Sequence, residues 1–483
     1  MRGRSPPPPP PAARPETPLT PFPPLTTHPH PVGGGGSLVL TFFPPFLFWV
    51  PMQKKSMSKR KRLEVENSYS GFKPPSSPCP AKVDVTHSDI TPKQFFDEYV
   101  SKRRPVLLDG VLTDEGWRGS QWTIKHLAEK AGEASVRVEH RKDAEGRFGC
   151  GKEKTMRFGE FLEEMKKKND LLYLSTQDLS VSIDGRPGII SPPLSLLKED
   201  FPLRPSLMGG LIPQNINLWM GCTRHGAPAS SGLHHDFHDN LYILVQGSKK
   251  FRLYSPADAG RMHTVGDMVS VHPNGLINYT GQPTRQDGSD MDAERALVAA
   301  EKLESAVEAS KQDDSDVDEQ AIMDAMDAVL DAEYGDAVEA EEGSSSDDEE
   351  EGLPDDAHAT EATGMAKGGG SLGAPMPKNF SHIDLYRPAQ EIEEQFPDFA
   401  GVACMEVEVK PGQMLFLPCG WFHEVSSESG DEGGVHQAIN YWFHPPDSHS
   451  FERPYKSRFW EKDWTAREQD GFVEGLVCPG PQL

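Results

Sequence analysis

The amino-acid sequence predicts a mainly β fold, a sandwich or barrel with flanking helices. Short runs rich in β-branched and aromatic residues recur between residues 105 and 443, and turn residues separate them, as is typical of such folds. The chain has 483 residues, but Gly and Pro are concentrated in segments without hydrophobic periodicity. We therefore expect one sizeable folded core with disordered segments attached to it.

Regular structure is expected to begin near Val83, and its first element is a helix. Thr91 can cap the first turn, and Pro92 fits the first helical position, where its missing N–H costs nothing. The apolar face of this helix is supplied by Phe95, Phe96 and Tyr99. Strand-like runs then follow at residues 105–110, 135–140, 171–177, 215–221, 240–247, 250–256, 405–418 and 436–443.

Residues 1–80 are predicted to be a disordered tail. They begin with Pro-rich and then Gly-rich sequence, which favours extended and flexible chain over packing. The apolar run at residues 38–50 is shorter than the roughly 20 residues needed to cross a bilayer, so we expect no membrane span. The basic cluster at residues 59–62 fits a nuclear-localisation signal and a plain solvated tail equally well, which leaves nucleus and cytoplasm both open.

Cysteine spacing bears on the compartment and on zinc. The six cysteines lie far apart, without a CxxC pair. Most are therefore expected to be buried apolar residues or surface thiols in a reducing compartment. This argues against a zinc site and against secretion.

The negative charge is confined to one segment. The formal net charge is −25, and residues 287–356 alone contain 27 acidic and 3 basic residues. We expect residues 283–376 to form a disordered acidic insertion on a loop of the β domain, because strand-like sequence resumes after them. Apolar residues at helical spacing within residues 322–330 indicate one marginal helix there. The insertion can attract a basic protein partner such as a histone tail, and direct nucleic-acid binding is not expected.

The stretch "GLHHDFHDN" places His234 and Asp236 two residues apart before a strand-like run. In an extended strand, residues i and i+2 point to the same face, so this pair can supply two of the three ligands of a facial triad for ferrous iron. His235 would point to the opposite face. The spacing leaves the role of His238 open. An HxD pattern alone also occurs in ordinary surface clusters of His and Asp.

A third ligand is available about 190 residues later. In "KPGQMLFLPCGWFHEV" a Pro-Gly turn leads into an apolar strand, and a sharp turn then presents His423. A second histidine from a distant strand completes a site of two histidines and one carboxylate. Taken alone, His423 also fits an ordinary core histidine beside Trp421.

Four motifs together resemble the JmjC family of iron- and 2-oxoglutarate-dependent oxygenases, in its small cupin-like branch of protein hydroxylases. They are "YLSTQ", "GLHHDFHDNLYILVQGSKKFRLYSP", "PGQMLFLPCGWFHEV" and "INYWF", in this order. The resemblance covers residues 84–282 and 377–446, which it predicts to be two parts of one JmjC domain, followed by a helical tail at residues 447–483. It implies a double-stranded β-helix (jelly-roll, cupin) around Fe(2+), with 2-oxoglutarate as cosubstrate and O2 as oxidant.

The resemblance also implies roles for individual residues. It assigns the metal to His234, Asp236 and His423, and the distal carboxylate of 2-oxoglutarate to Lys249, whose neighbour Lys250 should point away. Further cosubstrate contacts are implied for Tyr173, Ser231, Asn240 and Asn440, each of which also fits an ordinary strand residue. No catalytic residue beyond the metal centre is expected.

Three functions remain open from the sequence. The leading hypothesis is hydroxylation of a protein side chain, with release of succinate and CO2. The second is a histone lysine demethylase with the same iron chemistry, although no chromatin-reading segment accompanies it. The third is a non-catalytic cupin-like interaction module, which would require a broken triad. The tail at residues 447–483 either mediates homodimerisation, as C-terminal helices of the family often do, or packs back onto the barrel.

Overall fold

The structure is a computed structural model, and it describes residues 65–77, 79–141, 152–181, 186–223, 229–281, 283–292, 295–299, 301–303, 323–324, 326, 376–430 and 434–469. All of them belong to one compact unit that spans residues 62–483. Its main part consists of two β-sheets, and no helix among the described residues is long and apolar enough to cross a membrane. The mainly β fold expected from the sequence is therefore confirmed.

The larger sheet has nine strands. Their order is β3 (Asp84–His87), β4 (Val106–Asp109), β16 (Gln413–Leu417), β11 (Asp239–Gln246), β18 (His436–Phe443), β8 (Pro213–Gly221), β7 (Leu172–Leu174), β5 (Ser135–His140) and β6 (Lys152–Arg157). Only β3 and β4 pair in parallel. The central strands β16, β11, β18 and β8 are antiparallel, which is the pattern of a jelly roll.

The second sheet has six strands, and a small third sheet lies at its side. The six strands run in the order β10 (His234–His235), β17 (Phe422–Glu428), β12 (Ser248–Tyr254), β15 (Cys404–Val409) and β2 (Ala81–Lys82), with β9 (Ala229–Ser230) also paired to β17. The third sheet consists of β1 (Glu66–Asn67), β13 (Met268–Val271) and β14 (Ile277–Tyr279).

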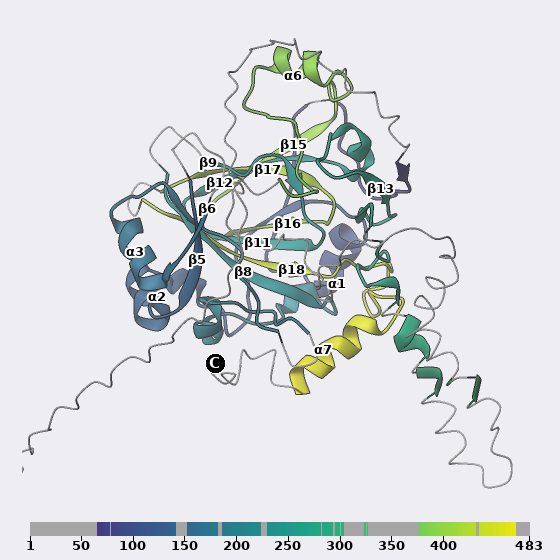
Figure 1. Cartoon of the computed structure of the whole chain (residues 1–483), viewed down its shortest axis with the longest axis horizontal. Coiled ribbons are helices and arrows are strands. Elements are labelled where there is room, and N and C mark those ends of the chain that lie inside the picture. The colour runs from purple at the N-terminus through teal and green to yellow at the C-terminus, as the bar shows by residue number, and fades with distance from the viewer. Residues whose placement is uncertain are drawn as a thin grey trace, which may run out of the picture. The chain divides into compact units, whose positions relative to one another are not determined.

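Helices cover the larger sheet on one face. They are α1 (Pro92–Phe95), continued by a π-helical turn at Phe96–Val100, then α2 (Ile124–Ala131) and α3 (Phe158–Lys166), the last two lying beside β5 in Figure 1. Thr91 caps α1 and Pro92 opens it, as predicted, because the Thr91 hydroxyl accepts from the Gln94 N–H. Two further helices are α6 (Ala389–Gln395) and α7 (Phe459–Gln469), and short 3₁₀ turns occur at Gly119–Gln121, Leu194–Leu196, Lys198–Asp200, Ser206–Met208 and Pro256–Arg261.

Alternation along β11 shows how the two sheets are held together. Leu241 and Ile243 pack into the cluster that includes the helices, whereas Tyr242 and Leu244 pack into a second cluster with Phe251 and other residues of the smaller sheet. Successive side chains of a strand point to opposite faces, so β11 serves both cores. The sequence of β11 is therefore nearly continuously apolar, and its inner face closes the space in which the candidate site lies.

Several expectations about boundaries were wrong. The ordered chain begins well before residue 80, because Tyr69 is buried and Phe72 stacks on Trp421. Packed structure also continues past residue 282, since Asp287 is buried and its carbonyl accepts from the Trp460 indole. Both segments are short and polar, so hydrophobic periodicity gave no signal for them. The helix expected within residues 322–330 and most of the acidic segment lie outside the described residues.

A buried ion pair holds three distant segments together beside the sheets. The guanidinium of Arg103 donates to both carboxylate oxygens of Asp239, and its Nε donates to the Asn274 carbonyl at 2.8 Å. The same Asp239 carboxylate accepts from the Cys419 backbone N–H at 2.9 Å. Both charged side chains are nearly fully buried. The pair therefore fixes the turn that follows β16 and precedes β17.

We predict that Arg103→Met lowers the free energy of unfolding by about 3–5 kcal/mol, because it leaves the Asp239 carboxylate buried without its counter-charge. The matched control is Arg104→Met, whose partner Asp84 is half-exposed, and we expect a loss of about 1 kcal/mol or less. Urea denaturation followed by tryptophan fluorescence measures both. Equal losses for the two variants would contradict the clamping role of the Arg103–Asp239 pair.

Candidate metal centre

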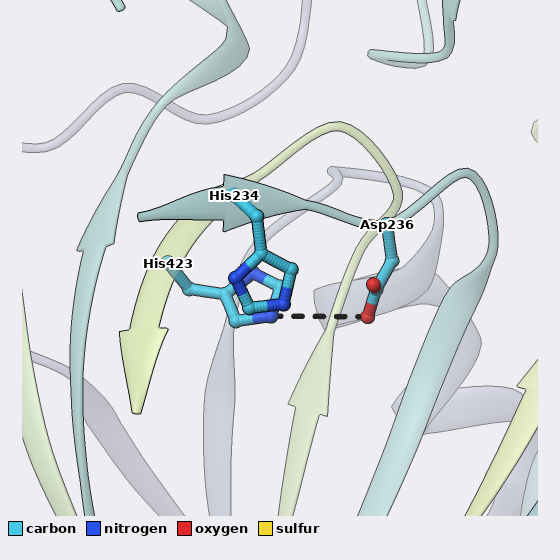
Figure 2. A group of neighbouring side chains, drawn as sticks. All are labelled: His234, Asp236 and His423. Carbon is cyan, nitrogen blue, oxygen red and sulfur yellow. Dashed lines mark ion pairs between the residues drawn. The ribbon is translucent and has the colours of Figure 1, made fainter. Parts of the chain in front are cut away.

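His234 and His423 meet across the pairing of β10 with β17. The two residues are directly opposite each other in the antiparallel register, and their ring centroids lie 4.3 Å apart. Figure 2 shows both imidazoles converging on the same space, His234 from the short strand β10 and His423 from the start of β17. β17 was not among the strand-like runs expected from the sequence, which placed only a sharp turn there.

Asp236 completes the group from the loop that follows β10. Its Oδ2 lies 3.8 Å from Nε2 of His423, and one ligand atom from each of the three residues lies within 4.8 Å of the others (Figure 2). The strand ends at His235, so Asp236 reaches the group from a loop and not from the extended strand on which the spacing argument was based. The backbone carbonyl of Asp236 instead accepts from the Gly420 N–H at 2.9 Å, which orients the loop.

Both histidines are oriented by backbone carbonyls. Nδ1 of His234 lies 2.9 Å from the Gly232 carbonyl, and Nδ1 of His423 lies 2.9 Å from the Trp421 carbonyl. Each Nδ1 must donate to its carbonyl, which leaves the Nε2 lone pairs free to bind a metal. Burial, followed by the neighbouring His423, lowers the pKa of His234 to about 4. The imidazole is therefore neutral at pH 7, which is the form that ligates a metal.

The other two histidines of the cluster do not join this group. His235 is fully buried on the opposite side, where Nε2 lies 2.7 Å from the Tyr279 hydroxyl and the two rings stack. The structure thus confirms that His235 points away from His234. His238 stacks loosely on Trp442 and faces the His444 ring edge, 5.7 Å away between centroids.

Lys249 lies on β12, directly opposite Ser427 of β17. It is 2% exposed, and its ammonium donates to the Ser427 hydroxyl at 2.6 Å and approaches the Tyr173 hydroxyl at 3.5 Å. Among the described residues no carboxylate lies within ion-pair distance of it. Burial lowers the pKa of Lys249 from its ordinary 10.5 to about 7. Lys250, one residue on, is exposed and pairs with Glu406, as the alternation of the strand predicts.

A chain of amides links the metal group to the inner face of the larger sheet. Asn240 approaches the Asp236 carboxylate at 3.4 Å, and its Oδ1 accepts from the Asn440 amide at 3.0 Å. Oδ1 of Asn440 in turn accepts from the Trp219 indole at 2.7 Å. Asn240 and Asn440 thus lie beside Asp236, and their contact with the cosubstrate stays a prediction.

Two serine hydroxyls lie near the candidate site, of which the sequence pointed only to Ser231. The Ser231 hydroxyl donates to the Gly232 carbonyl and accepts from the Val425 N–H, at 2.9 and 3.1 Å, so it closes the pairing of its own segment with β17. Its role toward the cosubstrate stays a prediction. Ser427, which contacts Lys249 directly, was missed. It lies four residues after His423, so strand alternation from that histidine would have placed it on the same face.

The paired sheets and the convergent His, Asp and His side chains define a cupin-like fold with a candidate metal centre. A profile of the cupin-like domain family matches residues 92–449. JmjC domain-containing protein 4 from Schizosaccharomyces pombe is 34% identical over 440 residues, which cover 81% of this chain and 90% of the relative. The chain therefore belongs to the cupin-like JmjC family, as its motifs predict.

Two further relatives match over shorter regions. The human bifunctional peptidase and (3S)-lysyl hydroxylase JMJD7 is 25% identical over 189 residues, which cover 37% of this chain and 56% of the relative. The tRNA wybutosine-synthesizing protein 5 of Danio rerio is 27% identical over 208 residues, which cover 40% and 60%. The aligned part is thus little more than half of each of these relatives.

We predict that Lys249→Met stabilises the ligand-free protein. The folded-state pKa of Lys249 lies below its unfolded value, so the unfolded chain binds more protons between about pH 7 and 10, and wild-type stability rises with pH across that window. The gain from Lys249→Met should be a few kcal/mol near pH 6 and shrink toward pH 10. Thermal unfolding at several pH values measures it, with Lys250→Met as the control. If Lys249→Met instead lost stability at pH 6, the buried Lys249 charge would not be destabilising, and the prediction would be wrong.

Proposed function

We propose that the protein is an iron(II)- and 2-oxoglutarate-dependent dioxygenase that hydroxylates a protein side chain. One observation carries the proposal: His234, Asp236 and His423 come together, and the same strand that carries His423 places Ser427 opposite the buried Lys249. Lys249 has no carboxylate partner among the described residues. Two imidazoles and one carboxylate form the facial set typical of non-haem iron. The lysine supplies the cation that a dicarboxylate cosubstrate needs.

In this proposal, one set of residues binds the metal and another binds the cosubstrate. Iron would supply the oxidative chemistry, in which O2 oxidises the substrate side chain and converts 2-oxoglutarate to succinate and CO2. His234, Asp236 and His423 would hold it on one side and leave the other side open. Lys249, with Ser427 and Tyr173, would anchor the distal carboxylate by charge-assisted hydrogen bonds and so fix the orientation of the keto acid.

The hydrogen bonds of the three candidate ligands leave suitable atoms free to bind iron. Both histidines have Nδ1 committed to a backbone carbonyl, so Nε2 is the ligand atom in each. The Asp236 carboxylate accepts only a long hydrogen bond from Asn240 among the described residues, and an oxygen atom remains free to coordinate. These features suit a metal that takes nitrogen and oxygen ligands with open positions.

A protein substrate is favoured by a relative's name, and two alternatives have the same kind of support. The human relative is named a lysyl hydroxylase, which makes a lysine in a protein our first candidate target. Lysine-specific demethylase JMJ32 of Arabidopsis thaliana is 43% identical, but only over 68 residues, or 13% of this chain. The relatives named for wybutosine synthesis act on tRNA by name. The acidic segment at residues 287–356 favours a basic protein over a nucleic acid.

Localisation and assembly follow as proposals from the sequence. The basic cluster at residues 59–62 supports entry into the nucleus, and action in the cytoplasm is the alternative. For the C-terminal tail, α7 packs against the rest of the chain, because Trp464 is buried and Lys462 pairs with Glu301 at 2.6 Å. This contact favours packing onto the domain over a free dimerisation helix. Residues 470–483 lie outside the described chain.

We predict that purified protein loaded with iron(II) consumes 2-oxoglutarate and forms succinate slowly without substrate, and faster with it. Asp236→Ala should reduce bound iron and succinate formation to background, because two neutral imidazoles hold the metal weakly. Asp89→Ala, at an exposed carboxylate, is the control and should leave both unchanged. Metal content by mass spectrometry and succinate by NMR are the readouts. Wild-type protein that neither binds iron nor forms succinate would revive the non-catalytic module.

Hydroxylation and demethylation predict different products from matched lysine peptides. If the protein is a hydroxylase, an unmethylated lysine-containing substrate gains one oxygen atom stably, and no formaldehyde is released. If it is a demethylase, only methylated peptides react, and formaldehyde appears in step with succinate. Candidate proteins can be captured on an inactive His234→Ala variant and identified by mass spectrometry. Formaldehyde release from a methyl-lysine peptide, without any stable oxygen gain, would overturn our assignment.

A further inference from the structure

His436 is a fully buried histidine on the inner face of the larger sheet, close to Lys249. On β18 it lies opposite Gly221 of β8, and Gly221 lies opposite Tyr173 of β7, so the three residues form one row across the sheet. The ring centroids of His436 and Tyr173 are 5.7 Å apart. The Tyr173 hydroxyl in turn approaches the Lys249 ammonium at 3.5 Å.

Neither ring nitrogen of His436 has a hydrogen-bond partner among the described residues, although the side chain is fully buried. A buried polar group without a partner costs folding free energy, and such groups in native proteins call for an explanation. Lys249, nearby, is a buried cation without a carboxylate partner in the described chain. Lys249 thus lacks a counter-charge, and His436 lacks any hydrogen-bond partner, among the described residues. One shared anionic ligand would supply both.

Gly221 makes the close packing of this row possible. A Cβ atom at this position would lie 2.7 Å from the Tyr173 ring and 3.2 Å from Nε2 of His436. Real Cβ contacts are longer, so any side chain at residue 221 would push one of the two rings away. The glycine therefore lets both rings lie close together, beside the Lys249 ammonium that the Tyr173 hydroxyl approaches.

We infer that His436 donates a hydrogen bond to the distal carboxylate of 2-oxoglutarate, beside Lys249 and Tyr173. The inference rests on the proposed function, and it adds a cosubstrate-binding residue that the sequence motifs did not assign. Burial, followed by the charge of Lys249, lowers the pKa of His436 well below its ordinary value. The imidazole is therefore neutral at pH 7, and it supplies an N–H donor without a second positive charge.

The test compares two keto acids that differ only at the distal end. 2-Oxoglutarate carries a second carboxylate, and 2-oxopentanoate carries a methyl group in its place. Binding constants are measured by NMR titration with zinc in place of iron, so that no turnover occurs. His436→Phe keeps a ring of similar shape and removes the donor. The control, His126→Gln, changes a histidine on α2 whose ring bonds Asp200.

We expect His436→Phe to weaken 2-oxoglutarate about tenfold, as loss of a hydrogen bond to a charged group predicts, and to leave 2-oxopentanoate within about twofold. If this variant fails to fold, His436→Leu replaces it, with the same ratio of constants as the readout. Equal weakening of both ligands, or no change in either, would overturn the role of His436. A wild-type protein that binds neither ligand would instead refute the proposed function, and the inference with it.

Discussion

The antiparallel pairing of β17 with β10 and β12 is the constraint on which the site depends. It places His423 opposite His234 at one end, and Ser427 opposite Lys249 at the other. His423 and Ser427 are four residues apart, so both side chains leave β17 on the same face. The strand β17 therefore sets the separation between the candidate metal residues and Lys249. A slip of one residue would turn both away from the inner space.

Two buried polar side chains between the sheets, Lys249 and His436, do not stabilise the ligand-free fold. Lys249 is a buried charge without a carboxylate partner in the described chain, and His436 has two nitrogens without acceptors or donors there. Burial of the apolar cluster around Phe251 and Trp421 offsets their cost. The Arg103–Asp239 pair, by contrast, finds its partners within the chain. Lys249 lacks a counter-charge and His436 lacks a hydrogen-bond partner among the described residues, whereas Arg103 and Asp239 satisfy each other.

The strands were largely predictable from sequence because alternation is local, and so were the opposite directions of Lys249 and Lys250. The three candidate metal residues were found because their motifs lie in short stretches. The bend after His235 was not predictable, since it depends on the Gly420 N–H from a distant turn. Ser427 and His436 were missed for a related reason. Their proximity to Lys249 follows from register between strands that are far apart in sequence.

The chain that follows the acidic segment packs on one of the candidate metal residues. At its start, Asp287 is buried, and Asn274 donates to the Gln286 carbonyl. After it, Phe380 bridges to β10 and stacks on His234, with ring centroids 4.9 Å apart. Closing a longer loop costs only about 0.6 kcal/mol per doubling of its length, so firmly held ends allow a long insertion. The ring that stacks on the candidate metal ligand His234 thus belongs to the segment in which the described chain resumes after the acidic residues.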